Sequence, residues 1–126
     1  METGHFEIRQ ENNLIIFRPD GSFSLEQTKA YAAKFEELVK NLNNPPWGLL
    51  SVYGESASAD PGVQQRVWNQ LNWCLDQGCD YIGFVVTNEY QERLVEEVSK
   101  NLPFKDVKIF QDEQQGLAWI NQKLSY

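Results

Sequence analysis

The segment 54–58, Gly-Glu-Ser-Ala-Ser, is the part of this chain that comes closest to a catalytic motif. A Gly-x-Ser-x-Gly sequence places a serine nucleophile on a sharp turn between a strand and a helix. Here Ser58 stands where the second glycine is required. A serine hydrolase also needs a histidine to accept the serine proton, and His5, the only histidine, lies near the N-terminus. We therefore predict no catalytic residues and a protein that is not an enzyme.

Metal and cofactor chemistry have equally little support in the sequence. Cys74 and Cys79 are the only cysteines, and a zinc site needs about four ligands. Gly54 and Gly62 are not followed by the Gly-Lys-Ser/Thr sequence that binds nucleotide phosphates. We expect no metal, no cofactor and cysteines that are buried or partly buried free thiols.

Composition narrows the class of partner. The chain has 126 residues, 41% of them apolar, which fits one domain over residues 1–126 with a packed core. Its net charge is −7, from 11 basic and 18 acidic residues, and this disfavours nucleic acid and anionic membranes as partners. The sequence shows no signal peptide and no apolar run long enough to span a membrane, so we expect a cytoplasmic protein.

A hairpin opens the chain. Residues 6–10 alternate apolar and polar side chains, Asn12 and Asn13 suit a tight turn, and Leu14–Phe17 forms the returning strand. Because Leu14–Phe17 is apolar throughout, we expect it to be buried on both faces. The segment 19–22, Pro-Asp-Gly-Ser, is expected to end this strand.

Helical and strand patterns then alternate to the C-terminus. Helix starts are predicted at the capping box of Ser24 and Gln27, at Asp60-Pro61, at Thr87 or Asn88, and at Asp112. Apolar strands are predicted at 47–52, 81–86 and 107–110. The order predicts an α/β fold with about four helices and an approximately five-stranded, mostly parallel sheet opened by the antiparallel hairpin.

In parallel sheets, ligand sites lie at the carboxyl ends of the strands, beside helix N-termini. In this chain those places are Phe17–Ser24, Tyr53–Gly62, Thr87–Tyr90 and Gln111–Glu113.

This order of elements resembles the SpoIIAA-like, or STAS, superfamily of anti-sigma-factor antagonists. The resemblance covers nearly the whole chain and is carried by four segments. These are the hairpin Phe6–Phe17, the helix Leu25–Leu42, the strand–loop–helix Leu49–Val67 and the ending Val107–Ile120, where an acidic cap precedes Ala-Trp-Ile. The resemblance implies a binding or regulatory module rather than an enzyme.

Phosphorylatable members of that superfamily carry Asp-Ser-Ser/Thr-Gly at the start of the second long helix. The matching region of this chain contains Ser56 and Ser58 without that motif. The neighbouring carboxylates of Glu55 and Asp60 would repel a phosphate. We therefore interpret the segment as an exposed polar loop before a capped helix.

Four tryptophans, Trp47, Trp68, Trp73 and Trp119, could fill the core or line an apolar cavity, and we favour the core. Trp68 and Trp73 lie beside the main apolar stripe of their helix, so one of them could be partly exposed. An exposed tryptophan would mark an interaction surface and would fit a weak homodimer.

The sequence leads to two hypotheses. In the first, a protein partner binds the contact residues Tyr53, Glu55, Ser56, Ser58, Asp60 and Trp68. In the second, which the resemblance also implies, the chain carries a small apolar or lipid-like ligand, as Sec14-like proteins do. A carrier requires an apolar cavity of roughly 300 Å³ or more.

Overall fold

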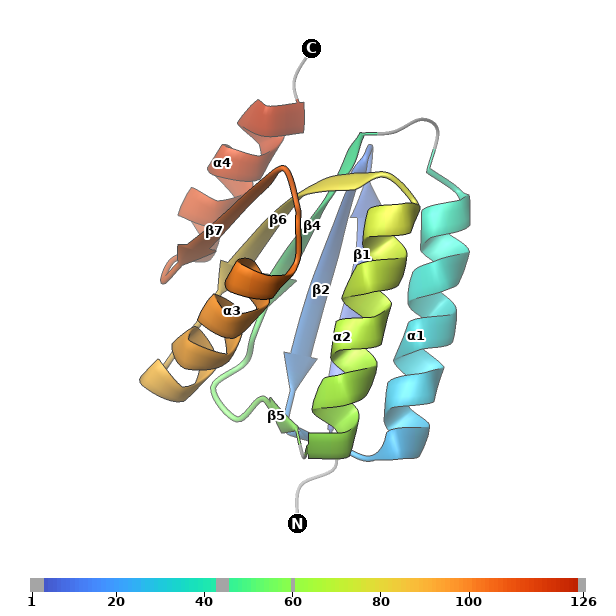
Figure 1. Ribbon diagram of the computed structural model, residues 1–126, viewed down its shortest axis with the longest axis vertical. Helices are drawn as coiled ribbons and strands as arrows, with labels where there is room; N and C mark the ends of the chain where they lie inside the picture. Colours follow the sequence, from blue (N-terminus) through green and yellow to red (C-terminus); the bar gives the residue numbers. More distant parts are fainter. Residues whose placement is uncertain (1–3, 43–45, 60, 125–126) are drawn as a thin grey trace.

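The computed structural model describes residues 4–42, 46–59 and 61–124, in which helices cover both faces of a sheet (Figure 1). The elements in chain order are β1 (His5–Glu11), β2 (Leu14–Asp20), β3 (Ser22–Phe23), α1 (Leu25–Lys40), β4 (Trp47–Val52), β5 (Ser58–Ala59), α2 (Pro61–Asp76), β6 (Cys79–Val85), α3 (Glu89–Asn101), β7 (Asp106–Phe110) and α4 (Glu113–Leu124).

The main sheet has five strands in the order β1-β2-β4-β6-β7. The hairpin strands β1 and β2 are antiparallel, and each later neighbour is parallel to the one before it. Asn12 turns the hairpin with a φ of 55°, a left-handed conformation that asparagine tolerates. The predicted sheet, parallel except for its opening hairpin, is confirmed.

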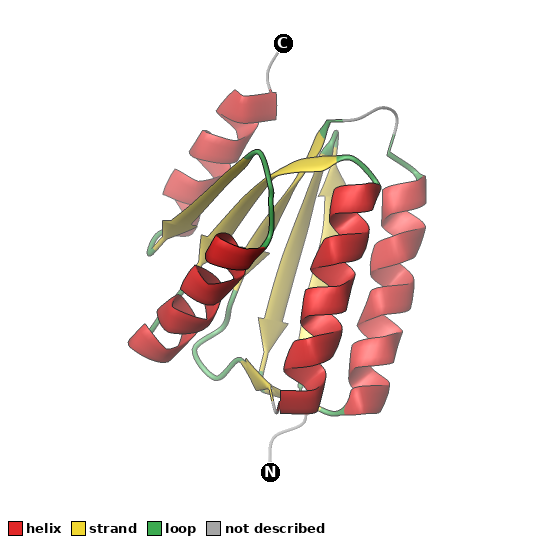
Figure 2. Ribbon diagram, viewed as in Figure 1, coloured by secondary structure: helices red, strands yellow, loops and turns green. Residues whose placement is uncertain are grey.

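Helices α1, α2 and α3 lie on one face of the sheet, and α4 lies on the other (Figure 2). Strand β2 shows how both faces are filled. Ile15 packs in the core cluster with Phe35 of α1 and Leu71 of α2, whereas Leu14 and Ile16 pack with Ile120 of α4. These three β2 residues are almost completely buried, as predicted for Leu14–Phe17, whereas Phe17 at the end of that run is only partly buried.

The helix starts are determined by local side-chain caps. The Ser24 Oγ accepts from the Gln27 backbone N–H at 3.2 Å, and the Gln27 side chain accepts from the Ser24 N–H at 3.0 Å. Asn88 caps α3 by accepting from the Gln91 N–H, and Asp112 caps α4 by accepting from the Gln114 N–H, both at 2.9 Å. These three predicted caps are confirmed, while Asp60, predicted to cap α2, lies outside the described residues.

The second strand ends within the segment 19–22, as predicted, but β2 is longer than the predicted Leu14–Phe17 and continues through Pro19 to Asp20. Pro19 has no N–H, and its carbonyl points toward the loop after β4, where it accepts from the Gly54 N–H at 2.9 Å. The pairing of β2 with β4 ends at Phe17 and Ser51. The missing donor of Pro19 therefore costs no hydrogen bond of the sheet.

The sequence predicts only a loop over 54–59, but the structure contains the short strand β5 there, paired with the short strand β3 that follows β2. Ser22 of β3 pairs with Ser58 of β5, and Phe23 pairs with Ala59, in a parallel two-stranded ladder. This ladder joins the connection after β2 to the connection after β4. Sequence patterns of two residues are too short to predict such a pairing.

Within the part of the chain that the structure describes, no helix has the length and apolar character needed to cross a membrane.

Candidate functional site

The 53–57 loop, which follows β4 and precedes β5, contains three of the predicted contact residues. Glu55 and Ser56 are exposed, and Tyr53 is partly buried at the end of the strand. Ser58 lies in β5 and Asp60 lies outside the described residues. Trp68 lies in the middle of α2, where it is half-buried against the main core. Trp68 is therefore less exposed than Glu55 and Ser56 of the loop.

Asp20, at the end of β2, holds one side of the 53–57 loop. One carboxylate oxygen accepts from the Gly21 N–H at 2.9 Å and from the Ser56 N–H at 3.0 Å. The loop backbone lies directly against this carboxylate, because a Cβ atom added to Gly54 would stand only 2.2 Å from the Asp20 Cγ. Glycine is required at position 54 for this close approach.

Gln91, in the first turn of α3, holds the other side of the loop. Its Nε2 donates to the Gly54 carbonyl at 2.9 Å and to the Ala57 carbonyl at 3.4 Å. Its Oε1 accepts from the Thr87 N–H at 2.8 Å. Gln91 is 4% exposed, so its amide forms these bonds away from water, where an unpaired polar group would be costly.

The loop is thus connected to two of the other places that the sequence identified at the carboxyl ends of strands. Asp20 belongs to the predicted place Phe17–Ser24, and Thr87 belongs to Thr87–Tyr90. Gln91, one residue beyond the predicted boundary, provides the connection between Thr87 and the loop. Sequence reasoning missed Asp20 and Gln91 as functional candidates, because each acts on backbone groups more than thirty residues away.

The surface beside the loop is polar, with one aromatic side chain. Thr87, Asn88 and Glu89 are exposed, and Tyr90 is 51% exposed. Tyr90 is the one large hydrophobic residue that is classed as exposed in the described ranges. No tryptophan in those ranges is comparably exposed, but Trp68 and Trp73 are each partly exposed, as predicted for one of them.

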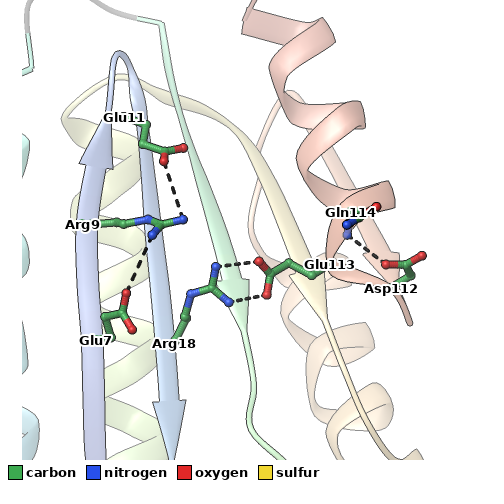
Figure 3. A network of polar contacts seen from close by, with 7 residues as sticks. All are labelled: Glu7, Arg9, Glu11, Arg18, Asp112, Glu113 and Gln114. Carbon is green, nitrogen blue, oxygen red and sulfur yellow. Dashed lines mark hydrogen bonds and ion pairs between the residues drawn. The ribbon is translucent and has the colours of Figure 1, made fainter.

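The fourth predicted place, Gln111–Glu113, is connected to β2 by an ion pair. Both guanidinium nitrogens Nη1 and Nη2 of Arg18 donate to the carboxylate of Glu113, at the start of α4 (Figure 3). Each side chain is about a third exposed or less. The hydrogen bonds from Arg18 lower the pKa of Glu113, and those same bonds raise the pKa of Arg18. Arg9 makes weaker, exposed pairs with Glu7 and Glu11 on the neighbouring strand.

A small cavity lies beneath the 53–57 loop, between the sheet and helices α1 and α2. Its volume is about 30 Å³, and its lining is mainly aromatic and aliphatic. Tyr53 forms part of the lining, with its ring stacked on that of Phe84 at a centroid distance of 6.2 Å. Burial raises the pKa of the Tyr53 phenol, and it raises the pKa of Tyr31, across the cavity, to about 12.

The cysteines are placed as predicted. Cys74 and Cys79 are free and buried, and burial raises the pKa of each thiol. His5 is exposed at the start of β1. Among the described residues no cluster of three or more His, Cys, Asp or Glu side chains could hold a metal ion.

No protein-family model matches this chain, and no curated protein sequence matches it. Solved structures do match it over nearly its whole length. An uncharacterised DUF3478-family protein with a SpoIIAA-like fold, from Shewanella loihica PV-4, is 16% identical and aligns with a TM-score of 0.70, covering 95% of both chains. An anti-sigma factor antagonist from Mycobacterium paratuberculosis is 7% identical, with a TM-score of 0.63 and 94% of both chains covered. The chain therefore has the SpoIIAA-like fold, which its sequence resemblance predicted.

Proposed function

We propose that this chain is a non-enzymatic regulatory module of the cytoplasm that binds a protein partner through residues 53–61 and the first turn of α2. The exposed side chains of Glu55 and Ser56 provide the centre of the contact. The proposed contact also includes Tyr53, Ser58, Asp60 and Trp68.

The observation that carries this proposal is the way the loop is held. Asp20 and Gln91 bind its backbone from two different elements, yet Glu55 and Ser56 between them remain exposed. A loop that already has one shape loses less conformational entropy when a partner binds. Binding residues are commonly found on loops that a rigid scaffold positions in this way.

The fold comparison supports the class of function. One solved structure of similar fold is an anti-sigma factor antagonist, a protein described by its action on another regulatory protein. The sequence identity is too low to carry over a partner, so the proposal extends only to a protein partner of unspecified sequence.

A phosphorylation switch at Ser56 is not part of the proposal. The Ser56 N–H, which could help to bind a phosphate, already donates to the Asp20 carboxylate at 3.0 Å. A phosphate added to Ser56 would stand near this negative charge and that of Glu55.

The carrier hypothesis is also not proposed. The cavity beneath the loop measures about 30 Å³, roughly a tenth of the smallest volume expected for a small-molecule carrier site.

The proposal is tested by affinity capture from the organism's own extract with matched charge variants. Glu55→Lys and Glu97→Lys make the same charge change at exposed positions, the first in the loop and the second on α3. A true partner is retained by the unmodified chain and by Glu97→Lys, and is lost with Glu55→Lys and with Ser58→Asp. Circular dichroism must show that all variants are folded. A partner retained by all four chains would show that the loop is not the contact surface.

Native mass spectrometry of the protein isolated from its own cells separates the alternatives. A small-molecule adduct that is lost on denaturation would support a carrier. A covalent phosphate that survives denaturation would support a switch at a serine.

A further inference from the structure

The cavity beneath the 53–57 loop combines an apolar lining with several polar groups from different elements. Gln70 of α2 and Ser51 of β4 line it, together with the phenol-bearing residues Tyr31 of α1 and Tyr53. Ser51 is one of three polar residues that are buried in the described part of the chain, at 4% exposed. The two phenols are near enough for the charge of Tyr31 to raise the pKa of Tyr53.

One of these groups lacks a hydrogen-bond partner. The Nε2 of Gln70 is fully buried and finds no acceptor among the described residues. Leaving a buried amide donor unpaired costs on the order of the desolvation of that group, so native proteins rarely do so. Gln70 lies in the third turn of α2, on the helix face that it shares with the cavity-lining residues Val67 and Cys74. The donor therefore needs an acceptor that occupies the cavity.

The size and charge of the cavity define that acceptor. To hold one water molecule, a cavity needs about 10–15 Å³ of volume that the centre of a water molecule can occupy. The present volume of about 30 Å³ admits about two, whereas a cavity that binds benzene measures about 150 Å³. Among the residues that the structure describes, the cavity lining includes no Lys, Arg or His that would favour an anion and no Asp or Glu that would favour a cation.

We infer that this cavity is an internal hydration site, in which about two ordered water molecules accept from Gln70 Nε2 and bridge it to the polar groups of Ser51 and Tyr53. A water molecule can both accept from the amide and donate to a hydroxyl oxygen, so it satisfies groups on α2 and β4 that do not meet directly. The site links α2 to the strand that leads into the 53–57 loop. It does not depend on the partner proposed for that loop.

The inference is tested first by a high-resolution crystal structure of the unmodified chain. We expect density for water within about 3.2 Å of Gln70 Nε2. In solution, the side-chain amide protons of Gln70 should show magnetisation transfer from a long-lived bound water. A Gln70 side chain that is turned toward bulk solvent, or a cavity without water density, would overturn the inference.

Two variants of α2 provide a matched comparison. Gln70→Leu removes the buried donor, and Gln65→Leu makes the same change at an exposed position one turn earlier. The backbone amides around the cavity should lose their transfer from bound water in Gln70→Leu and keep it in Gln65→Leu. Unchanged transfer in Gln70→Leu would show that Gln70 does not hold the water. If Gln70→Leu fails to fold, Ser51→Ala tests the same site from β4, with the same expected loss.

Discussion

Gln91 of α3 donates from Nε2 to the Gly54 carbonyl, 37 residues earlier in the chain, at 2.9 Å. The same amide accepts from the Thr87 N–H, so one buried side chain connects two strand-to-helix connections. Because the Gly54 and Ala57 carbonyls have this side chain as a donor, the shape of the candidate contact loop depends on a residue outside it.

Replacing Gln91 by alanine should loosen the 53–57 loop. The variant removes the side-chain donor of both loop carbonyls, of which Gly54 keeps only the Ala57 N–H, and we expect this to lower the free energy of unfolding by about 1–3 kcal/mol. Hydrogen exchange should accelerate at Ser56 and Ala57, whose N–H groups are held by bonds within this loop region. The control is Arg93→Ala, at an exposed position of the same helix, which should change neither quantity measurably. Unchanged exchange at Ser56 and Ala57 in Gln91→Ala would contradict the role assigned to Gln91.

Gly54 and Asp20 should show a strong energetic coupling. A Cβ on residue 54 would stand 2.2 Å from the Asp20 Cγ, so Gly54→Ala must displace the carboxylate or the loop. We expect a loss of about 1–3 kcal/mol in unfolding free energy, as overpacking usually causes. Asp20→Ala alone removes the acceptor of the Gly21 and Ser56 N–H groups.

The double variant distinguishes this clash from a general effect of alanine at position 54. Once Asp20 is shortened to alanine, the added Cβ no longer meets a carboxylate. The double variant should therefore be destabilised by clearly less than the sum of the two single variants, by at least about 0.5 kcal/mol. Urea unfolding of the unmodified chain, the two single variants and the double variant measures this difference. If the two single losses of unfolding free energy add up to the loss in the double variant, the coupling is disproved.

Local signals and long-range contacts differ in how well the sequence predicts them. The capping box of Ser24 and Gln27 follows from neighbouring residues alone and is confirmed, and the predicted buried run Leu14–Phe17 is confirmed for all of its residues but Phe17. Gln91 stands among polar and charged neighbours of a helix start, where no local pattern marks it for burial. Its partners are backbone groups, whose position depends on the register of β4 beside β6. The extension of β2 beyond Phe17 was missed for a similar reason, because Pro19 fits into a strand only where its missing N–H faces the unpaired side.

The Arg18–Glu113 pair should make stability depend on pH in acid. Its hydrogen bonds lower the pKa of Glu113 below the ordinary value of 4.5. A carboxyl group whose pKa is lower in the folded state contributes stability that is fully present above its unfolded pKa, and loses it as the pH falls through the folded value. The free energy of unfolding of the unmodified chain should therefore exceed that of Glu113→Gln by about 0.5–1 kcal/mol at pH 7.

That difference should shrink as the pH drops below 4.5, because the protonated carboxyl no longer accepts charge-assisted bonds from Arg18. Glu11→Gln is the control, since Glu11 is exposed and its pair with Arg9 measures 3.6 Å. At pH 7 the Glu11→Gln variant should lose less free energy of unfolding than Glu113→Gln does. Parallel stability curves for the unmodified chain and Glu113→Gln across this range would show that the ion pair does not stabilise the fold.

The two cysteines should report on unfolding of the core. Cys74 and Cys79 are at most 1% exposed, and burial raises the pKa of both thiols, which disfavours the reactive thiolate. An aromatic disulfide reagent at pH 8 should therefore label them only when the protein opens. With an ordinary stability of at least about 5 kcal/mol, labelling should be more than about a thousandfold slower than in denaturant. Cys74 lies on α2 and Cys79 begins β6, so their protection covers both the helix and the central sheet. Rapid labelling of one cysteine alone would show that α2 or β6 opens separately from the rest of the fold.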